Sequence, residues 1–149
     1  MQSPVAIRAL AVADRAAWQP LWQAYLAFYK TELPAETYDL TFARYTDPDR
    51  ADMRAWMAWD GATALGLVHV IVHSHGWQAA PVTYLQDLFT APQARGKGVA
   101  RALIETVYAD ADAALRPSVY WLTQTGNDTA RALYDRIANV TEFIKYARR

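Results

Sequence analysis

The sequence predicts an α+β protein, a three-layer α/β arrangement with a mixed central sheet of about six strands and about four flanking helices. Apolar strand-like runs and amphipathic helical patterns follow one another in the order β-α-α-β-β-β-α-β-α-β. Three successive strands without a helix between them favour antiparallel pairing, and later strands separated by helices favour parallel pairing. With 149 residues, 53% of them hydrophobic, the chain can fill one core and leaves little room for a second. We therefore expect a single domain over residues 1–149.

The N-terminal third predicts one strand and two helices. Residues 5–10 form a short apolar run, typical of a strand. Asp14 is expected to cap a helix, because large apolar side chains then recur every three or four residues. These are Trp18, Leu21, Trp22, Tyr25, Leu26 and Tyr29. Pro34 suits the first turn of a second helix that ends near Tyr45.

The middle of the chain predicts a three-stranded antiparallel unit. Residues 53–59 and 64–73 are apolar runs joined by Asp60-Gly61, a dipeptide typical of tight hairpin turns. Residues 83–90 form the third strand of this unit, which Ala91-Pro92 ends.

The C-terminal third predicts two helices and two strands. Apolar residues at helical spacing follow Gly98, and β-prone residues 119–123 come next. Asn127 is expected to cap a last helix, and residues 143–146 to form a final strand.

Composition excludes several classes of function. Fifteen Lys and Arg residues balance fifteen Asp and Glu residues, which argues against a dedicated nucleic-acid binder. The absence of cysteine excludes disulfides, thiolate metal sites and a cysteine nucleophile, and fits a reducing compartment. Asp14 and Arg15 interrupt the stretch where a signal peptide would be apolar, and no run is long enough to span a membrane. We expect a soluble, cytoplasmic protein without nucleic-acid or membrane partners.

The most informative segment is the loop that follows the strand at 83–90. Gly96 and Gly98 allow close approach of the backbone to a ligand, and the start of the following helix offers free N–H groups to an anion. A dinucleotide-binding G-x-G-x-x-G would need glycine where Arg101 stands, and no Walker A motif is present. A phosphate-binding loop and an ordinary loop with two glycines both fit this segment alone.

Two motifs resemble those of the GNAT superfamily of N-acetyltransferases. Gln93-Ala94-Arg95-Gly96-Lys97-Gly98 matches the acyl-CoA signature (Arg/Gln)-x-x-Gly-x-(Gly/Ala) between a strand and a helix. Residues 127–134, NDTARALY, match Asn-x-x-Ala-x-x-Leu-Tyr on the last helix. The resemblance covers about residues 84–138 and is similar to the histone-and-polyamine-acetyltransferase-like branch. It implies a GNAT-like sheet whose parallel part surrounds the CoA site.

The resemblance implies where acetyl-CoA binds. The pyrophosphate would lie on the backbone N–H groups of the glycine loop, and the pantetheine arm would pair with the end of the fourth strand. The acetyl thioester would lie near Asn127 and Tyr134. The implied cosubstrate-binding residues are Leu88, Phe89, Thr90, Arg95, Gly96, Lys97, Gly98, Val99, Ala100, Asn127 and Tyr134.

The resemblance also implies the chemistry, which is direct attack of a neutral amine on the thioester in a ternary complex. Tyr134 stands where the family has the general acid for the departing thiolate, and Asn127 lies beside it. The backbone N–H of Leu88 is expected to polarise the carbonyl. For the base, Asp87 is the only carboxylate on the fourth strand. Asp87 is a candidate base, with a role in orienting the substrate or the strand as the alternative.

The acceptor and the assembly remain open at this stage. A small-molecule amine, a polyamine, and a protein lysine or N-terminus are all compatible, and a non-catalytic acyl-CoA sensor is the alternative to an enzyme. His69, His73 and His75 share one parity but lack carboxylates at ligand spacing, so no metal is expected. Glu142 replaces a glycine usual in the family before Phe143, and little sequence follows for a further strand. We therefore expect a homodimer in which a partner completes this edge.

Overall fold

The computed structural model describes residues 5–149 and shows a five-stranded mixed sheet. Its strands are β1 (Ala6–Ala9), β2 (Met53–Asp60), β3 (Thr63–His73), β4 (Val82–Thr90) and β5 (Val119–Tyr120), which lie side by side in that order. The pairings from β1 to β4 are antiparallel, and β4 and β5 are parallel. The predicted fold class is confirmed, with antiparallel pairing first and parallel pairing last.

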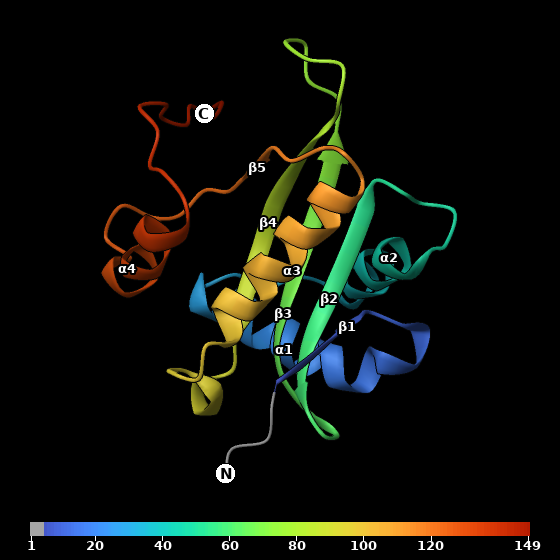
Figure 1. Ribbon diagram of the computed structural model, residues 1–149. Coiled ribbons are helices and arrows are strands. Elements are labelled where there is room, and N and C mark those ends of the chain that lie inside the picture. The colour runs from blue at the N-terminus through green and yellow to red at the C-terminus, as the bar shows by residue number, and fades with distance from the viewer. Residues whose placement is uncertain (1–4) are drawn as a thin grey trace.

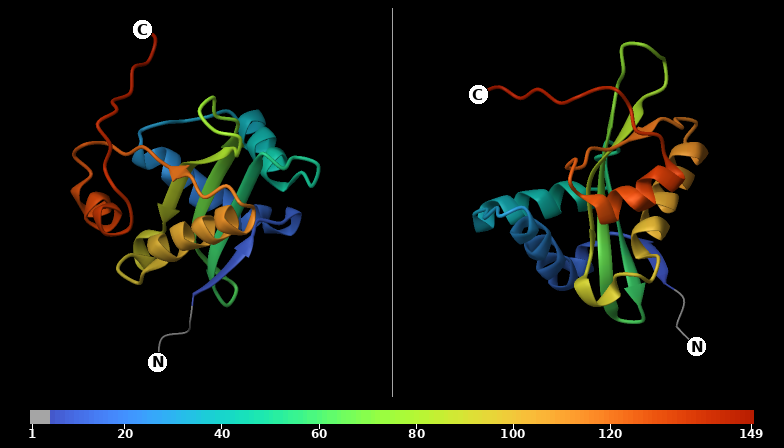
Figure 2. Two further views of the ribbon diagram at one scale, coloured as in Figure 1. Left: turned by 45° about the horizontal axis from the view of Figure 1, so that its top comes forward. Right: turned by 90° about the vertical axis from the view of Figure 1, so that its left-hand side faces the viewer.

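Helices cover both faces of this sheet (Figures 1 and 2). Helices α1 (Arg15–Phe28) and α2 (Ala35–Thr46) lie on one face, and α3 (Val99–Ala113) lies on the other. Helix α4 (Asp128–Ile137) follows β5 and lies beyond the β4 side of the sheet (Figure 1). Short 3₁₀ turns, η1 (Val12–Asp14) and η2 (Pro92–Ala94), precede α1 and α3.

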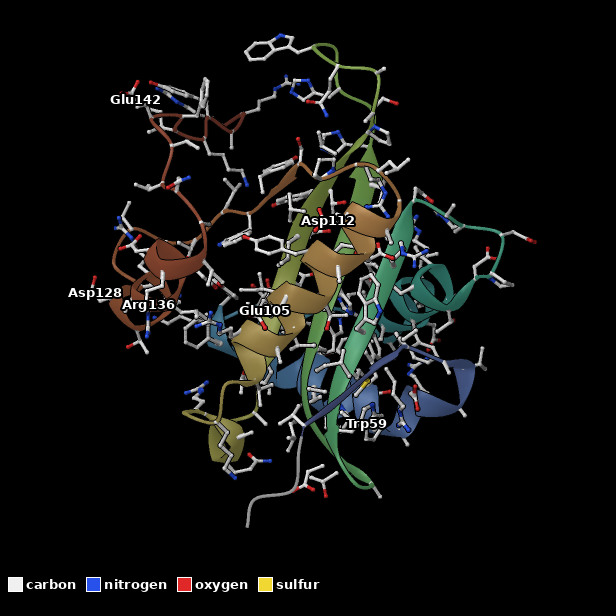
Figure 3. The ribbon with its side chains drawn as sticks, in the orientation of Figure 1. Trp59, Glu105, Asp112, Asp128, Arg136 and Glu142 are labelled. Atoms are coloured by element: carbon white, nitrogen blue, oxygen red, sulfur yellow. The ribbon has the colours of Figure 1, made fainter. Side chains whose placement is uncertain are left out.

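The core lies between these layers because the middle strands are apolar on both faces. Met57 and Ala58 on β2 and Leu67 and Val68 on β3 are successive residues that are all fully buried. Such runs are expected where helices cover both sides of a sheet. Helix α3 adds a buried apolar stripe, whereas Glu105 and Asp112 lie on its outward face (Figure 3).

Gly66 lets β3, β4 and α3 approach one another closely. A Cβ atom at this position would lie 2.6 Å from the backbone oxygen of Phe89 and 3.0 Å from a methyl carbon of Val99. Only glycine fits without movement of the β4 backbone. The absence of a side chain at Gly66 therefore brings the end of β4 close to the first turn of α3. These two segments flank the glycine loop.

Both residues predicted to cap helices stand at the N-cap position, but neither side chain forms a capping hydrogen bond with its helix. Asp14 precedes α1, yet its carboxylate accepts a hydrogen bond from the backbone N–H of Ala11 (2.9 Å) instead of from the helix. Asn127 precedes α4 without a side-chain bond to that helix, and its amide donates to Thr123 Oγ1 (3.4 Å). In each case the side chain forms its hydrogen bond with a residue that precedes the helix.

The predicted sixth strand at residues 143–146 is wrong, and the strand at 119–123 is shorter than predicted. β5 pairs with β4 only at Val119 and Tyr120, after which the two segments separate. Residues 143–146 pair with no strand of the described sheet, although their composition is β-prone. Val140, Phe143, Ile144 and Tyr146 are all largely exposed.

The helices in the described part of the chain are too short or too polar to cross a membrane.

Candidate active site

A cavity of about 690 Å³ opens beside the end of β4. It is bounded by α1, the end of β4, the glycine loop with the start of α3, and α4. Its lining includes Leu88, Phe89, Thr90, Arg95, Gly96, Gly98, Val99, Ala100, Asn127 and Tyr134, all predicted from the sequence. Its lining also includes Tyr25, Phe28, Tyr29, Ala94, Arg101, Thr129, Ala130, Leu133 and Arg136, which were not predicted.

The glycine loop presents backbone N–H groups to this cavity. Gly96 and Gly98 adopt φ angles of 79° and 77°, in the left-handed region that favours glycine. The first hydrogen bond inside α3 runs from the N–H of Ala102 to the carbonyl of Gly98 (3.0 Å). The N–H groups of the first turn therefore lack helical partners and lie at the positive end of the helix dipole. Such a terminus suits an anion, and phosphate above all.

Arg95 and Lys97 differ from the other loop residues that were predicted to bind the cosubstrate. The N–H of Arg95 donates to the carbonyl of Pro92 (3.4 Å), so this group is already engaged. The side chain of Arg95 nonetheless contributes a cation to the cavity lining. Lys97 is exposed and does not line the cavity.

The end of β4 offers a backbone edge to the same cavity. β5 pairs with β4 at Thr83 and Tyr84 only, so residues 85–90 have no strand partner on that side. An unpaired edge of this kind accepts an extended ligand as an additional strand. The hydroxyl of Thr90 is buried here and has no hydrogen-bond partner among the described residues. This edge can therefore take a ligand that carries amide groups.

Tyr134 lines both the cavity and a second, smaller pocket of about 30 Å³. Tyr25, Tyr29, Leu88 and Tyr134 line both spaces, so the two meet at these four residues. The ring of Tyr134 packs edge-on against Trp121 at 5.3 Å between centroids. Burial, with a smaller effect of Tyr29, raises the pKa of the Tyr134 hydroxyl above its ordinary value. The hydroxyl therefore keeps its proton at neutral pH.

The smaller pocket is aromatic and uncharged. Its lining is Tyr25, Tyr29, Leu85, Gln86, Leu88, Trp121, Leu122, Thr123 and Tyr134. Gln86 is the extra residue of a bulge in β4, since Asp87 pairs with His69 and Leu85 with Val70. The bulge places Gln86 at the pocket wall while its neighbour Asp87 lies in the interior.

Asp87 lies behind the cavity wall and does not line either space. One carboxylate oxygen accepts a hydrogen bond from the Tyr25 hydroxyl at 2.8 Å, and the other lies 3.0 Å from His69 Nδ1. The charge of Asp87 thus reaches the cavity through Tyr25. The sequence indicated Tyr25 only as a core position of the first helix, because its spacing matches the apolar stripe of α1.

The three histidines make separate contacts. His69 is fully buried, whereas His73 Nε2 lies 2.8 Å from the Tyr120 hydroxyl and His75 Nδ1 accepts the backbone N–H of Trp77. Within residues 5–149, no three His, Cys, Asp or Glu side chains gather in a way that could hold a metal ion.

Comparison with known proteins agrees with this geometry. The family model of the acetyltransferase (GNAT) family matches residues 18–138. This chain belongs to that family. As a GNAT-type acyltransferase it is similar to the D-amino-acid N-acetyltransferase HPA3 of Saccharomyces cerevisiae (strain ATCC 204508 / S288c). The two are 38% identical over 148 residues, or 97% of this chain and 90% of the relative.

Solved structures share the fold. One is the aminoglycoside N-acetyltransferase AAC(6')-Iy in complex with a CoA bisubstrate analogue, at a TM-score of 0.86 and 18% identity over 99% of both chains. Another is a ribosomal-protein-alanine N-acetyltransferase from Brucella melitensis biovar Abortus 2308. Its TM-score is 0.82 and its identity 22%, over 98% of this chain and 99% of that one. At these identities the likeness concerns the fold.

Proposed function

We propose that this GNAT enzyme transfers the acetyl group of acetyl-CoA to the primary amine of a small molecule, and that D-amino acids are the first acceptors to test. The observation that carries the proposal is the junction of the two spaces at Tyr134. One space has the loop and strand edge that suit CoA, and the other has room only for a small group. The D-amino-acid N-acetyltransferase to which the chain is similar supports the choice of acceptor.

The residues around the large cavity fit acetyl-CoA. In the proposed complex the pyrophosphate binds the free N–H groups from Gly96 to Ala100, and Arg95 adds positive charge. The pantetheine amides pair with the β4 edge at Leu88, Phe89 and Thr90, where a buried hydroxyl lacks a partner. Lys97 would act from outside, as a cation near the phosphates.

The proposed reaction is direct attack of the neutral amine on the thioester carbonyl. The backbone N–H of Leu88 polarises the carbonyl, and Asn127 orients the thioester. The C–N bond forms, the C–S bond breaks, and the Tyr134 hydroxyl donates its proton as negative charge develops on sulfur. Asp87 is the proposed final acceptor of the proton that the ammonium form of the amine must lose.

The lining of the smaller pocket favours an acceptor with a single cationic group. Aromatic rings such as those of Tyr25, Tyr29 and Trp121 attract one ammonium group through their π faces. None of the residues that line this pocket is a carboxylate, so a second ammonium group would lack a counter-charge. The pocket therefore suits a single amino group, and the rest of the acceptor, including the carboxylate of an amino acid, must lie outside it.

The direct test is an acceptor panel with acetyl-CoA. D-amino acids, L-amino acids, a polyamine, an aminoglycoside and a lysine peptide are compared by thiol release and by mass of the product. We expect acetylation of D-amino acids with at least a tenfold higher kcat/KM than for the polyamine. A preference for the polyamine or the peptide would overturn the acceptor assignment. Tight acetyl-CoA binding without acetylation of any amine would instead favour a sensor function.

We also propose that the enzyme is a homodimer. After α4 follows an exposed apolar segment that contains Val140, Phe143, Ile144 and Tyr146. An exposed apolar segment of this kind is typical of a subunit interface.

A further inference from the structure

A chain of hydrogen bonds runs from the protein interior to the wall of the cavity. Trp18 Nε1 donates to His69 Nε2 at 3.0 Å, and His69 Nδ1 lies 3.0 Å from Asp87 Oδ2. The Tyr25 hydroxyl donates to Asp87 Oδ1 at 2.8 Å. Trp18 and Tyr25 come from α1, His69 from β3 and Asp87 from β4, so three elements build the chain. Tyr25 is its one member that lines the cavity and the small pocket.

The direction of these bonds fixes the form of His69. An indole N–H only donates, so His69 Nε2 must accept, and the ring proton lies on Nδ1. His69 Nδ1–H then donates to Asp87, which makes Asp87 the acceptor of both bonds that it forms. The fully buried ring is further held by Tyr45, stacked on it at 4.3 Å between centroids. Both hydrogen bonds of Asp87 therefore use its oxygens as acceptors, as an ionised carboxylate requires.

Among residues 5–149, the carboxylate of Asp87 has no Lys or Arg partner. Its side chain is 9% exposed. A buried carboxylate of this kind is costly unless a cation compensates it. The cationic acceptor, at the small pocket, would supply that charge on the far side of the Tyr25 hydroxyl.

We propose that Tyr25 is a catalytic residue that passes the proton of the acceptor ammonium to Asp87, with His69 and Trp18 as positioning residues. The proposal rests on the proposed function. The Tyr25 oxygen takes a proton from R-NH₃⁺ while its own proton moves to Asp87 Oδ1, which leaves R-NH₂, neutral Tyr25 and neutral Asp87. As the C–N bond forms and the C–S bond breaks, Tyr134 donates its proton to sulfur and takes the second nitrogen proton in return, so the products are the amide, the free thiol and neutral Tyr134. Asp87 then returns its proton through Tyr25 to solvent.

The groups around Asp87 suit a relay and not a free phenolate. Those that face it are His69 from β3, Tyr25 from α1, Tyr29 directly after α1, Tyr45 from α2 and Tyr84 from β4. Burial first, and the negative charge of Asp87 second, raise the pKa of the Tyr25 hydroxyl far above its ordinary value. Tyr25 therefore stays protonated and moves a proton only by exchange with its partner.

The test compares Tyr25→Phe and Asp87→Asn with Tyr45→Phe, using the amine that the wild-type enzyme acetylates best. Tyr45→Phe keeps the ring that stacks on His69 and removes only the hydroxyl, which forms no hydrogen bond among the described residues and does not line the cavity. Asp87→Asn can still accept from His69 with its oxygen, but its amide cannot take a proton. At pH 7 we expect each of the first two variants to lose about 10²-fold in kcat, with unchanged acetyl-CoA affinity. The double variant should lose no more, and Tyr45→Phe should match the wild type.

The pH dependence separates a relay from a structural role. For an amine of lysine-like pKa, the neutral fraction rises about tenfold per pH unit below pH 10. The deficit of Tyr25→Phe should therefore shrink about tenfold per unit from pH 7 to pH 9. A deficit that stays constant with pH, or one that Tyr45→Phe shares, would overturn the relay. If the wild-type enzyme acetylates no amine of the panel, the proposed function fails instead.

Discussion

At the scale of single residues, the site is defined by two tyrosines that meet the same small pocket from different helices. Tyr134 on α4 and Tyr25 on α1 both line the junction of the two spaces. Their environments differ, because Tyr25 donates to a buried carboxylate whereas Tyr134 packs against Trp121. From this difference we infer opposite roles in proton transfer for the two tyrosines. Tyr134 gives a proton to the leaving sulfur, and Tyr25 removes one from the attacking nitrogen.

The acid role of Tyr134 predicts a specific kinetic change. Tyr134→Phe should lower kcat by about 10²-fold and leave the acetyl-CoA dissociation constant within about twofold, since only a proton donor is lost. Steady-state thiol release and calorimetry measure the two quantities. Because the pKa of Tyr134 is raised by burial, the wild-type rate should show no loss from this group below pH 10. An unchanged kcat in the variant would make Tyr134 a packing residue only.

At the scale of elements, the separation of β4 from β5 has two consequences. It leaves the β4 edge open for the cosubstrate, and it limits β5 to two residues that could offer an edge to residues 143–146. The segment after α4 leads away from that helix to the C-terminus (Figure 1), and its apolar side chains are exposed. A partner subunit that covers this segment would bury those side chains.

The dimer proposal predicts that charge in this segment weakens self-association. Phe143→Asp combined with Ile144→Asp should shift the protein from dimer to monomer at micromolar concentration, because both side chains are exposed in the single chain. Val12→Asp is the matched control, since Val12 is also exposed and apolar but lies in η1. Sedimentation velocity measures the mass. A wild-type monomer, or a dimer that both variants retain, would contradict the proposal.

At the scale of the whole molecule, local patterns predicted helices α1 to α4 and strands β1 to β5, although β5 is shorter than predicted and the two 3₁₀ turns were not predicted. Asp60-Gly61 and its flanking apolar runs predicted the hairpin of β2 and β3, and the spacing after Gly98 predicted α3. The strand at 143–146 failed because strand formation needs a neighbouring edge, which composition does not reveal. The same limit applies to the separation of β4 from β5.

The site was predictable where a motif carried it. The glycine loop and the residues around Tyr134 line one cavity, as the two motifs implied. Tyr25 was hidden because its spacing is that of a core aromatic, and the hydrogen bond that distinguishes it goes to Asp87, 62 positions away in sequence. A buried polar chain across three elements has no local signature. Asp87 was noticed as the strand's carboxylate, but its link to the cavity through Tyr25 needed the structure.

The most direct test of the account is a calorimetric titration of the purified protein with acetyl-CoA at moderate salt. If the cavity beside the glycine loop is the cosubstrate site, the titration should show about one molecule bound per chain with a micromolar dissociation constant, on the order of −8 kcal/mol. Gly98→Val should weaken that binding at least tenfold, because the φ of 77° there is strained for valine. No binding to well-folded wild-type protein, or equal binding to Gly98→Val, would contradict the site.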